Sequence, residues 1–176
     1  KDAQKLLVSF YTMRNILRDG GAQDIAASQQ LNYTVGSGGY TNSTTPSIWP
    51  SKGVITSPYG RRIDPVTGAS SAFHEGIDIA DDYGTSIVAT AAGTVTIAGY
   101  TDGGYGNLVE IDHGNGFVTR YGHNSAVLVT PGMSVKQGQV IALMGSTGKS
   151  TGAHVHYEVR INGTAVDPMV FLPISN

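Results

Sequence analysis

The spacing of apolar residues changes near Trp49, which separates two regions of the chain. Within residues 1–18, leucine, phenylalanine, methionine and isoleucine recur every three to four positions, the period of an amphipathic helix. The pair Gly20-Gly21 ends this pattern. We expect an N-terminal helix that packs on the domain or forms the end of an upstream coiled coil, with a membrane-surface helix as the alternative.

After Trp49, short apolar runs alternate with turn residues, which is typical of β-strands. Asn115-Gly116 and Asn162-Gly163 are pairs that favour tight hairpins. Because no helical segment interrupts the runs, the pattern predicts a mainly β protein with an antiparallel sheet, either open or folded into a sandwich. The expected strands are residues 54–56, 77–80, 87–89, 93–100, 108–112, 117–123, 140–144 and 154–161.

Residues 22–48 are rich in glycine, serine, threonine and asparagine. Such a segment has too few apolar side chains to form a core by itself, so we expect a polar linker or wrapping arm. The predicted organisation is therefore an N-terminal helix and arm over residues 1–48, followed by one folded domain over residues 49–173.

Composition narrows the class of protein. Only 14% of the 176 residues are charged, against a usual ~25%, and 24 are glycine, which favours an all-β protein outside the cytoplasm. The absence of cysteine excludes disulfides, cysteine metal ligands and thiol nucleophiles. A formal net charge of −2 provides no long-range attraction to nucleic acid, so no such partner is expected.

Targeting signals are not visible in the sequence. There is no run of about 20 apolar residues and no signal-peptide pattern. The chain begins with Lys1 instead of methionine, so we expect a fragment whose targeting or anchoring segment lies upstream.

The segment around His154 and His156 carries the strongest chemical signal. Successive side chains of a strand point to opposite faces, so these two imidazoles share a face, with Cα atoms about 6–7 Å apart. One of them could bind a metal while the other acts on a substrate. Val155, Tyr157 and Val159 point the other way and are expected in the core.

Two further motifs contain zinc-compatible residues. His74 and Asp78 would lie about 13 Å apart on a straight strand, so joint chelation requires a bend, which Gly76 permits. Alternation at the end of the strand 117–123 places Tyr121 and His123 on one face. Each motif alone is also common as polar surface or structural histidine, but three together in a chain without cysteine indicate a metal site. His113 falls in a predicted turn, where we expect it on the solvated surface.

These motifs, in this order, resemble the LytM or lysostaphin type of zinc endopeptidase, peptidase family M23. The similarity covers about residues 49–172, including the motif His74-x-x-x-Asp78, the motif Tyr121-x-His123 and the motif His154-x-His156. It departs from the family pattern at Ala153 and Asn124, neither of which removes a functional side chain. Further similar blocks are residues 57–65, 116–121 and 145–152.

The resemblance implies an antiparallel LytM-like fold, related to barrel-sandwich hybrids, and zinc-dependent hydrolysis of peptide cross-links in bacterial peptidoglycan. By motif position, His74, Asp78 and His156 bind Zn²⁺, which activates a water against the scissile carbonyl. His123 and His154 form the catalytic pair that handles protons and the oxyanion.

The resemblance and the strand pattern give less definite roles to four other residues. Tyr121 and Arg62 are candidates for substrate contact, each with a structural alternative. Glu75 faces away from His74 on an extended backbone and is not expected to be the base. Glu158 shares a strand face with His156, where we expect a structural ion pair.

The implied substrate is a stem or bridge peptide of the cell envelope, which predicts a periplasmic or extracellular location. The cross-link itself could be D-Ala–diaminopimelate, D-Ala–Lys or a glycine bridge. The main alternative is a catalytically silent LytM-like module that binds the wall or activates a hydrolase. Residues 131–142 also resemble part of a biotinyl or lipoyl carrier, although no lysine stands at a hairpin tip in the acidic or methionine-containing setting that a modified lysine needs. Other zinc D-alanyl peptidases with a His-x-His strand are a further alternative, but they would differ in motif order.

Overall fold

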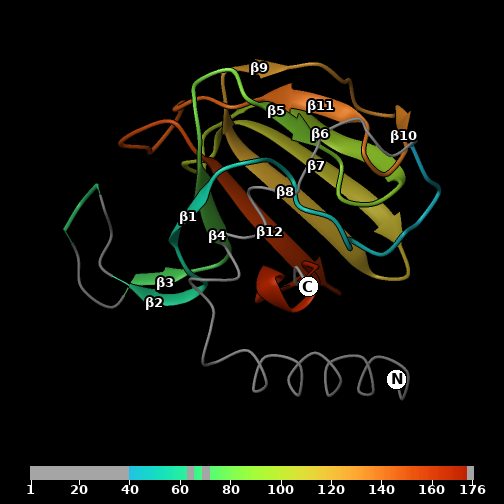
Figure 1. Cartoon of the computed structure of the whole chain (residues 1–176), viewed down its shortest axis with the longest axis horizontal. Coiled ribbons are helices and arrows are strands. Elements are labelled where there is room, and N and C mark those ends of the chain that lie inside the picture. The colour runs from blue at the N-terminus through green and yellow to red at the C-terminus, as the bar shows by residue number, and fades with distance from the viewer. Residues whose placement is uncertain (1–39, 63–65, 69–71, 174–176) are drawn as a thin grey trace.

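This computed structural model describes residues 40–62, 66–68 and 72–173, so the predicted N-terminal helix lies outside the described residues. Every strand pair in the described part is antiparallel, which confirms the predicted mainly β class (Figure 1). The large sheet has the strand order β1 (Val54–Ser57), β4 (Ile77–Ala80), β12 (Val155–Ile161), β8 (Phe117–Asn124), β7 (Gly106–Gly114), β6 (Gly93–Thr101) and β10 (Ser134–Val135).

The remaining elements are short. A three-stranded sheet has the order β5 (Ser86–Val88), β11 (Val140–Leu143) and β9 (Ala126–Val127). Strands β2 (Gly60–Arg62) and β3 (Ala72–His74) pair with each other, and β13 (Thr164–Val166) pairs with β12. The 3₁₀-helix η1 (Pro168–Val170) ends the described fold. Among the described residues, no helix is long and apolar enough to cross a lipid bilayer.

All eight predicted strands are present and differ from the prediction only at their ends. Strands β2, β3, β9, β10 and β13 were not predicted, because segments of two or three residues are too short to show alternation. The predicted hairpin turns are confirmed. Asn115 and Gly116 have φ of 52° and 84°, and Asn162 and Gly163 have φ of 50° and 82°, as the tightest hairpins require.

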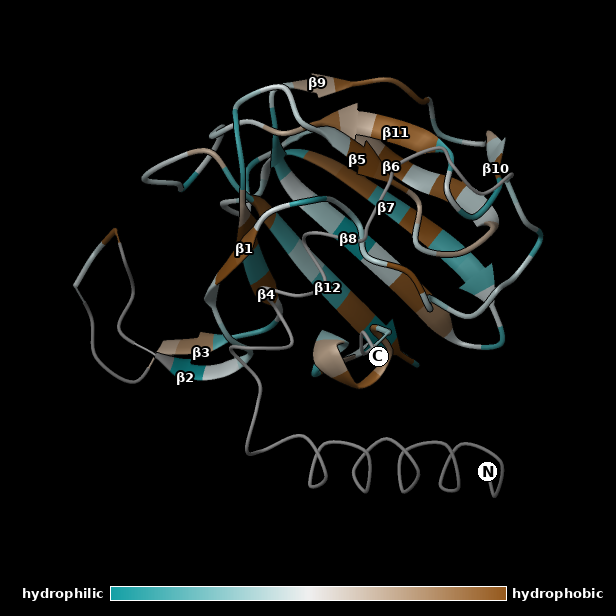
Figure 2. Ribbon diagram, viewed as in Figure 1, coloured by the Kyte–Doolittle hydropathy of each residue, from teal (hydrophilic) through white to brown (hydrophobic). Residues whose placement is uncertain are grey.

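The core lies between the large sheet and the three-stranded sheet. Val155, Tyr157 and Val159 on β12 are fully buried in it, as alternation predicts. Figure 2 shows the matching alternation of hydrophobic and hydrophilic residues along the long strands. Burial of this one face positions the other face of β12, which carries His156, toward the functional site.

The expectation that His113 is solvated is wrong. Strand β7 continues through it to Gly114, and the side chain is 4% exposed. Its Nδ1 donates to the carbonyl of Ala92 at 2.8 Å, and its Nε2 lies 2.7 Å from Oγ1 of Thr119. Pairing with β8 continues to Phe117, so the turn begins only after Gly114 and the His113 ring points inward.

The described end of the predicted arm packs on the domain. Thr41 pairs with Gln137, and the Ala92 N–H donates to the carbonyl of Ser43 at 2.6 Å. The Gln137 side-chain amide also donates to Oγ of Ser47 at 3.0 Å. These bonds attach residues 41–47 to the segments beside β10 and β6.

Candidate active site

The bend between β3 and β4 brings His74 and Asp78 together. Nε2 of His74 lies 3.0 Å from Oδ1 of Asp78, so the predicted bend is present. Glycine is required at position 76 because a Cβ atom there would overlap the carbonyl oxygen of Tyr157 on β12. The close approach of β12, and not only backbone freedom, therefore explains Gly76.

The third group comes from β12. His156 is paired in register with Asp78 on β4, and its Nδ1 lies 3.0 Å from Oδ1 of Asp78 and 3.0 Å from Nε2 of His74. Ligand atoms around a tetrahedral zinc ion are about 3.3 Å apart. Two imidazoles and one carboxylate within this spacing fit zinc and leave a coordination position for a substrate or water.

In His74 and in His156, the ring nitrogen that does not face Asp78 is held by a hydrogen bond. Nδ1 of His74 donates to the carbonyl of Pro58 at 2.8 Å, and Nε2 of His156 donates to Oε1 of Glu158 at 2.8 Å. Because these oxygens only accept, the facing nitrogens carry the hydrogens, and the nitrogens that point at Asp78 are the ones that would offer lone pairs to a metal ion in place of a proton. Metal-binding histidines are oriented in this way.

The electrostatics favour a cation at the centre. Burial alone would raise the pKa of Asp78, but hydrogen bonds with His156 and His74 outweigh it and hold that pKa well below its ordinary value. Burial opposes charge on His156 as well, yet its hydrogen bonds with Asp78 and Glu158 raise its pKa to about 9. The carboxylates thus stabilise positive charge here, and a bound metal ion would satisfy the same preference.

His123 stands beside this cluster at the end of β8. Its φ of 65° is unusual for a residue other than glycine, and such conformations are common at functional sites. Nδ1 donates to the carbonyl of Thr147 at 2.7 Å, which leaves the lone pair on Nε2. Burial lowers the pKa of His123 to about 4, so the ring is neutral at neutral pH.

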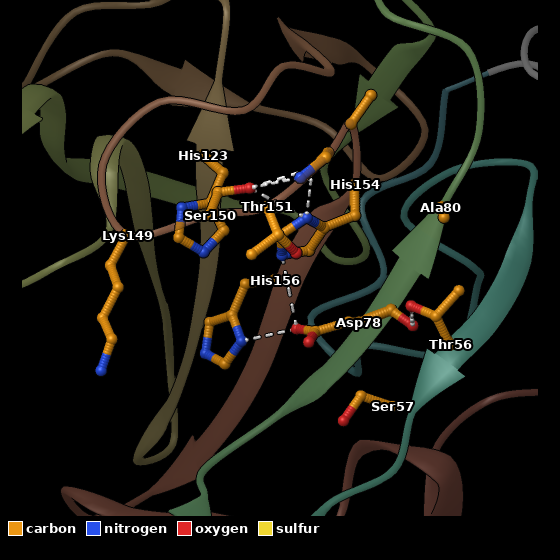
Figure 3. Close-up of a pocket in the computed structure, with 12 residues that line it drawn as sticks. Thr56, Ser57, Asp78, Ala80, His123, Lys149, Ser150, Thr151, His154 and His156 are labelled. Atoms are coloured by element: carbon orange, nitrogen blue, oxygen red, sulfur yellow. Dashed lines mark hydrogen bonds and ion pairs between the residues drawn. The ribbon is translucent and has the colours of Figure 1, made fainter. Parts of the chain in front are cut away.

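His154 completes the group. Its ring centroid lies 4.6 Å from that of His123, and its Nε2 lies 3.8 Å from Oδ1 of Asp78. Nδ1 of His154 donates to the carbonyl of Gly152 at 2.8 Å, so this ring, like that of His123, is oriented by a hydrogen bond to a backbone carbonyl. Figure 3 shows His123, His154, His156 and Asp78 gathered at one place.

Two cavities flank His123 and His156. The larger, about 410 Å³, is lined mainly by small or uncharged residues, including Thr56, Ala80 and residues 150–153. The smaller, about 240 Å³, is lined by Phe73, Tyr105 and other residues on the opposite side. Both cavities are lined by His123, Lys149 and His156, and the two together are called the groove.

Tyr121 does not line this groove. It is fully buried, and its hydroxyl accepts from the backbone N–H of Thr90 at 2.9 Å. The expectation that Tyr121 and His123 share a face is wrong, because the left-handed backbone at His123 interrupts the alternation. Arg62 lies on β2, where its backbone pairs with Ala72.

The carboxylates near the cluster have defined partners. Glu75 is half exposed and binds Arg160 at 2.6 Å, which agrees with its exclusion as the base. Glu158 forms the expected ion pair with Arg160 at 2.7 Å but also holds His156, a contact to which the shared strand face pointed. The sequence did not single out Tyr105 or Lys149, since both lie in irregular loops without a motif of metal-binding residues.

The fold and site thus define a β-sheet protein with a candidate metal centre beside two cavities. The sequence profile of Peptidase family M23 matches residues 72–168, and the chain belongs to this family. Over 120 residues it is 48% identical to "DD-carboxypeptidase/endopeptidase Mpg" of Neisseria meningitidis serogroup B, covering 68% of this chain and 27% of the relative. Over 125 residues it is 42% identical to "Murein hydrolase activator NlpD" of Escherichia coli, covering 71% and 31%.

Solved structures agree with the fold. A zinc-containing peptidase from Vibrio cholerae superposes with a TM-score of 0.63 at 34% identity, over 76% of this chain and 40% of that chain. The catalytic domain of lysostaphin from Staphylococcus simulans superposes with a TM-score of 0.59 at 34% identity, over 65% and 87%. The chain spans less than a third of the length of Mpg and NlpD, so it corresponds to one part of those proteins.

Proposed function

We propose that this chain is a zinc-dependent endopeptidase that hydrolyses peptide cross-links of bacterial peptidoglycan in the cell envelope. One observation carries the proposal: five side chains from four segments converge, and each of the four imidazoles has its outer nitrogen anchored to an acceptor. Such preorganisation of lone pairs toward one point is what metal-assisted hydrolysis needs. We propose residues 49–173 as the catalytic domain and residues 1–48 as an arm whose end, residues 41–47, binds to it.

His74, Asp78 and His156 would hold the zinc ion. When bound, zinc supplies a Lewis acid for the scissile carbonyl and lowers the pKa of water to about 7. His123 keeps a neutral ring with Nε2 facing the groove, so it can accept the proton of the attacking water. His154, whose ring lies beside it, can hold a proton at Nε2 for the oxyanion and the leaving amine.

The names of the relatives support the substrate class. Mpg is named a carboxypeptidase and endopeptidase, and NlpD a murein hydrolase activator. The groove on both sides of the cluster is consistent with a stem or bridge peptide that extends past the cleavage site. A peptidoglycan substrate would require a location in the periplasm or outside the cell, and we propose that location.

A catalytically silent activator is the second candidate, and the 42% identity to NlpD favours it. The complete set of metal-compatible and proton-handling residues favours the enzyme instead. Metal content separates the two, because a silent module has no need for stoichiometric zinc.

The decisive experiment is digestion of purified peptidoglycan by the zinc-loaded chain, with products identified by mass spectrometry. His154→Ala serves as the matched control because it leaves all three proposed ligands in place. We expect cleaved cross-links with the native chain and loss of activity by several orders of magnitude in the variant. No product from the native chain in its zinc-bound form would support the activator, and full activity of the variant would remove the role given to His154.

A further inference from the structure

Tyr105 contacts both halves of the proposed site. It precedes β7, and its ring centroid lies 5.8 Å from that of His156. Its hydroxyl donates to Oε1 of Glu158 at 2.6 Å, the same oxygen that accepts from Nε2 of His156. We propose that Tyr105 is a positioning residue of the metal centre: its hydroxyl fixes Glu158, which in turn holds the His156 ring in a metal-binding orientation. This inference rests on the proposed function and adds a residue to the site.

The direction of the Tyr105 hydrogen follows from its second partner. Nη1 of Arg120 donates to the Tyr105 hydroxyl oxygen at 3.1 Å, and a guanidinium group can only donate. The phenol oxygen therefore accepts from Arg120 and gives its single hydrogen to the carboxylate of Glu158. A hydrogen bond to an ionised acceptor is shorter and stronger than a neutral one. Since the hydroxyl both accepts and donates within the protein, the geometry favours positioning over contact with a substrate.

Glu158 is held at both of its carboxylate oxygens. Oε1 accepts from Tyr105 and His156, and Oε2 accepts from Nε of Arg160 at 2.7 Å. Removal of the Tyr105 hydroxyl takes away a donor at the oxygen that faces His156, so the carboxylate can turn more freely. The other ring nitrogen of His156, Nδ1, lies 3.0 Å from Oδ1 of Asp78. Freedom at Glu158 therefore becomes freedom in the position of a proposed ligand atom.

The backbone of Tyr105 is fixed by the other half of the site. Its carbonyl accepts from the N–H of His123 at 2.7 Å, the residue with a φ of 65°. A Cβ atom on the next residue, Gly106, would overlap the backbone of Thr147. The carbonyl of Thr147 in turn accepts from Nδ1 of His123. The phenol therefore extends from a backbone segment that cannot move without disturbing the proposed base.

Arg120 belongs to a row of charges across the large sheet. Glu110 on β7, Arg120 on β8 and Glu158 on β12 are paired in register on three neighbouring strands. Oε2 of Glu110 accepts from Nε of Arg120 at 2.6 Å, and the guanidinium carbon lies 5.5 Å from the centroid of the Tyr105 ring. Arg120 thus contacts both the ring and the hydroxyl of Tyr105, which restricts the orientation of the phenol.

The test is the zinc affinity of Tyr105→Phe, measured by competition with a chelator of known affinity. Phenylalanine keeps the ring and the backbone bond to His123 but removes the hydroxyl. We expect the zinc dissociation constant to rise by about threefold to tenfold, the factor that one hydrogen bond supplies. Tyr100→Phe is the matched control, because Tyr100 is 69% exposed and lines neither cavity. The same zinc affinity in Tyr105→Phe and the native chain would overturn the inference.

A double-mutant cycle determines whether Tyr105 acts through Glu158. Glu158→Ala removes the carboxylate, so Tyr105→Phe should change the zinc affinity little further in that background. An equal loss in both backgrounds would overturn the inference, because Tyr105 would then act by another route. A general structural defect gives that additive result, so the cycle separates positioning from loss of stability.

A measurement without metal separates this inference from the proposed function. In the metal-free chain, NMR of isotope-labelled histidine follows the exchange of the His156 Nε2 hydrogen with solvent. We expect this exchange to be about threefold to tenfold faster in Tyr105→Phe, because Glu158 then holds the ring less firmly. If the native chain binds no zinc, the proposed function fails and this exchange decides the inference. Faster exchange supports it, and an unchanged rate overturns it.

Discussion

Nε2 of His156 donates a hydrogen bond to Oε1 of Glu158, two residues further along the same strand, at 2.8 Å. Glu158 is 1% exposed and also accepts from the hydroxyl of Tyr105 at 2.6 Å and from Nε of Arg160 at 2.7 Å. Burial would raise the pKa of Glu158, but these partners, His156 first, lower it to about 2. The group is therefore a carboxylate that orients the ring of a proposed metal ligand.

Replacement of this carboxylate should weaken metal binding. Glu158→Gln keeps the shape of the side chain but removes its charge, so we expect zinc affinity to fall by about tenfold to a hundredfold. Competition with a chelator of known affinity measures the change. Asp112→Asn is the control, because Asp112 is an exposed carboxylate that accepts from the backbone N–H of Gly114 at 2.9 Å at the end of β7. Equal zinc affinity in both variants would contradict the orienting role of Glu158.

Variants of the proposed zinc ligands and a variant of the proposed proton carrier should differ in the zinc content of the purified protein. Asp78→Ala and His74→Ala each remove one of three converging atoms, and we expect both purified proteins to lose stoichiometric zinc. His154→Ala should retain the ion while turnover falls by several orders of magnitude. Elemental analysis and wall-digestion assays on the same preparations measure both quantities. Loss of zinc from His154→Ala would make His154 a ligand.

Gly76→Ala should disturb both the sheet and the site. The new methyl group would overlap the carbonyl of Tyr157 and push β4 away from β12. We expect the free energy of unfolding to fall by about 1–3 kcal/mol, with weaker zinc binding. Gly103→Ala is the control, because its nearest neighbour would be an ordinary contact with Tyr105 at 3.8 Å. Urea unfolding measures the difference, and equal stability would rule out a tight fit at Gly76.

His113 should make stability depend on pH. Burial lowers its pKa from the model-compound value of 6.5, against a hydrogen bond to Ala92 and the charge of Asp112, which raise it. The unfolded chain therefore binds more protons below about pH 6.5, and the contribution of His113 to stability is lost as the pH falls through that value toward the folded pKa.

The variant His113→Gln isolates this effect. Urea unfolding at pH 7.5 and pH 5.5 should show a larger loss of stability on acidification in the native chain than in the variant. The comparison of slopes removes any constant cost of the substitution and the contributions of the other histidines. The same pH dependence in both proteins would mean that His113 titrates alike in the folded and unfolded states.

Local sequence patterns predicted most of the strands and two of the turns. Alternation of apolar residues located β12 and buried Val155, Tyr157 and Val159, because one face of each strand must leave water. Asn-Gly pairs located two hairpins, since both positions need positive φ. The errors at His113 and Tyr121 arose where pairing or backbone conformation departed from a regular period. The left-handed backbone at His123 takes its own side chain out of the alternation that Tyr121 still follows, and no local sequence pattern predicts this conformation.

The sequence alone determined which donor atoms are available, because imidazoles and a carboxylate in a chain without cysteine restrict the chemistry of any metal site. Only the tertiary structure decided that they meet. His156 and Asp78 are separated by 78 positions, and their contact at 3.0 Å depends on the register of β12 against β4. A shift of one residue in the register of β12 would turn His156 into the core. The geometry of the metal site is therefore determined by the pairing of strands and not by the spacing of residues within a motif. The same holds for Lys149, which lies beside His123 because two glycine-rich loops contact each other.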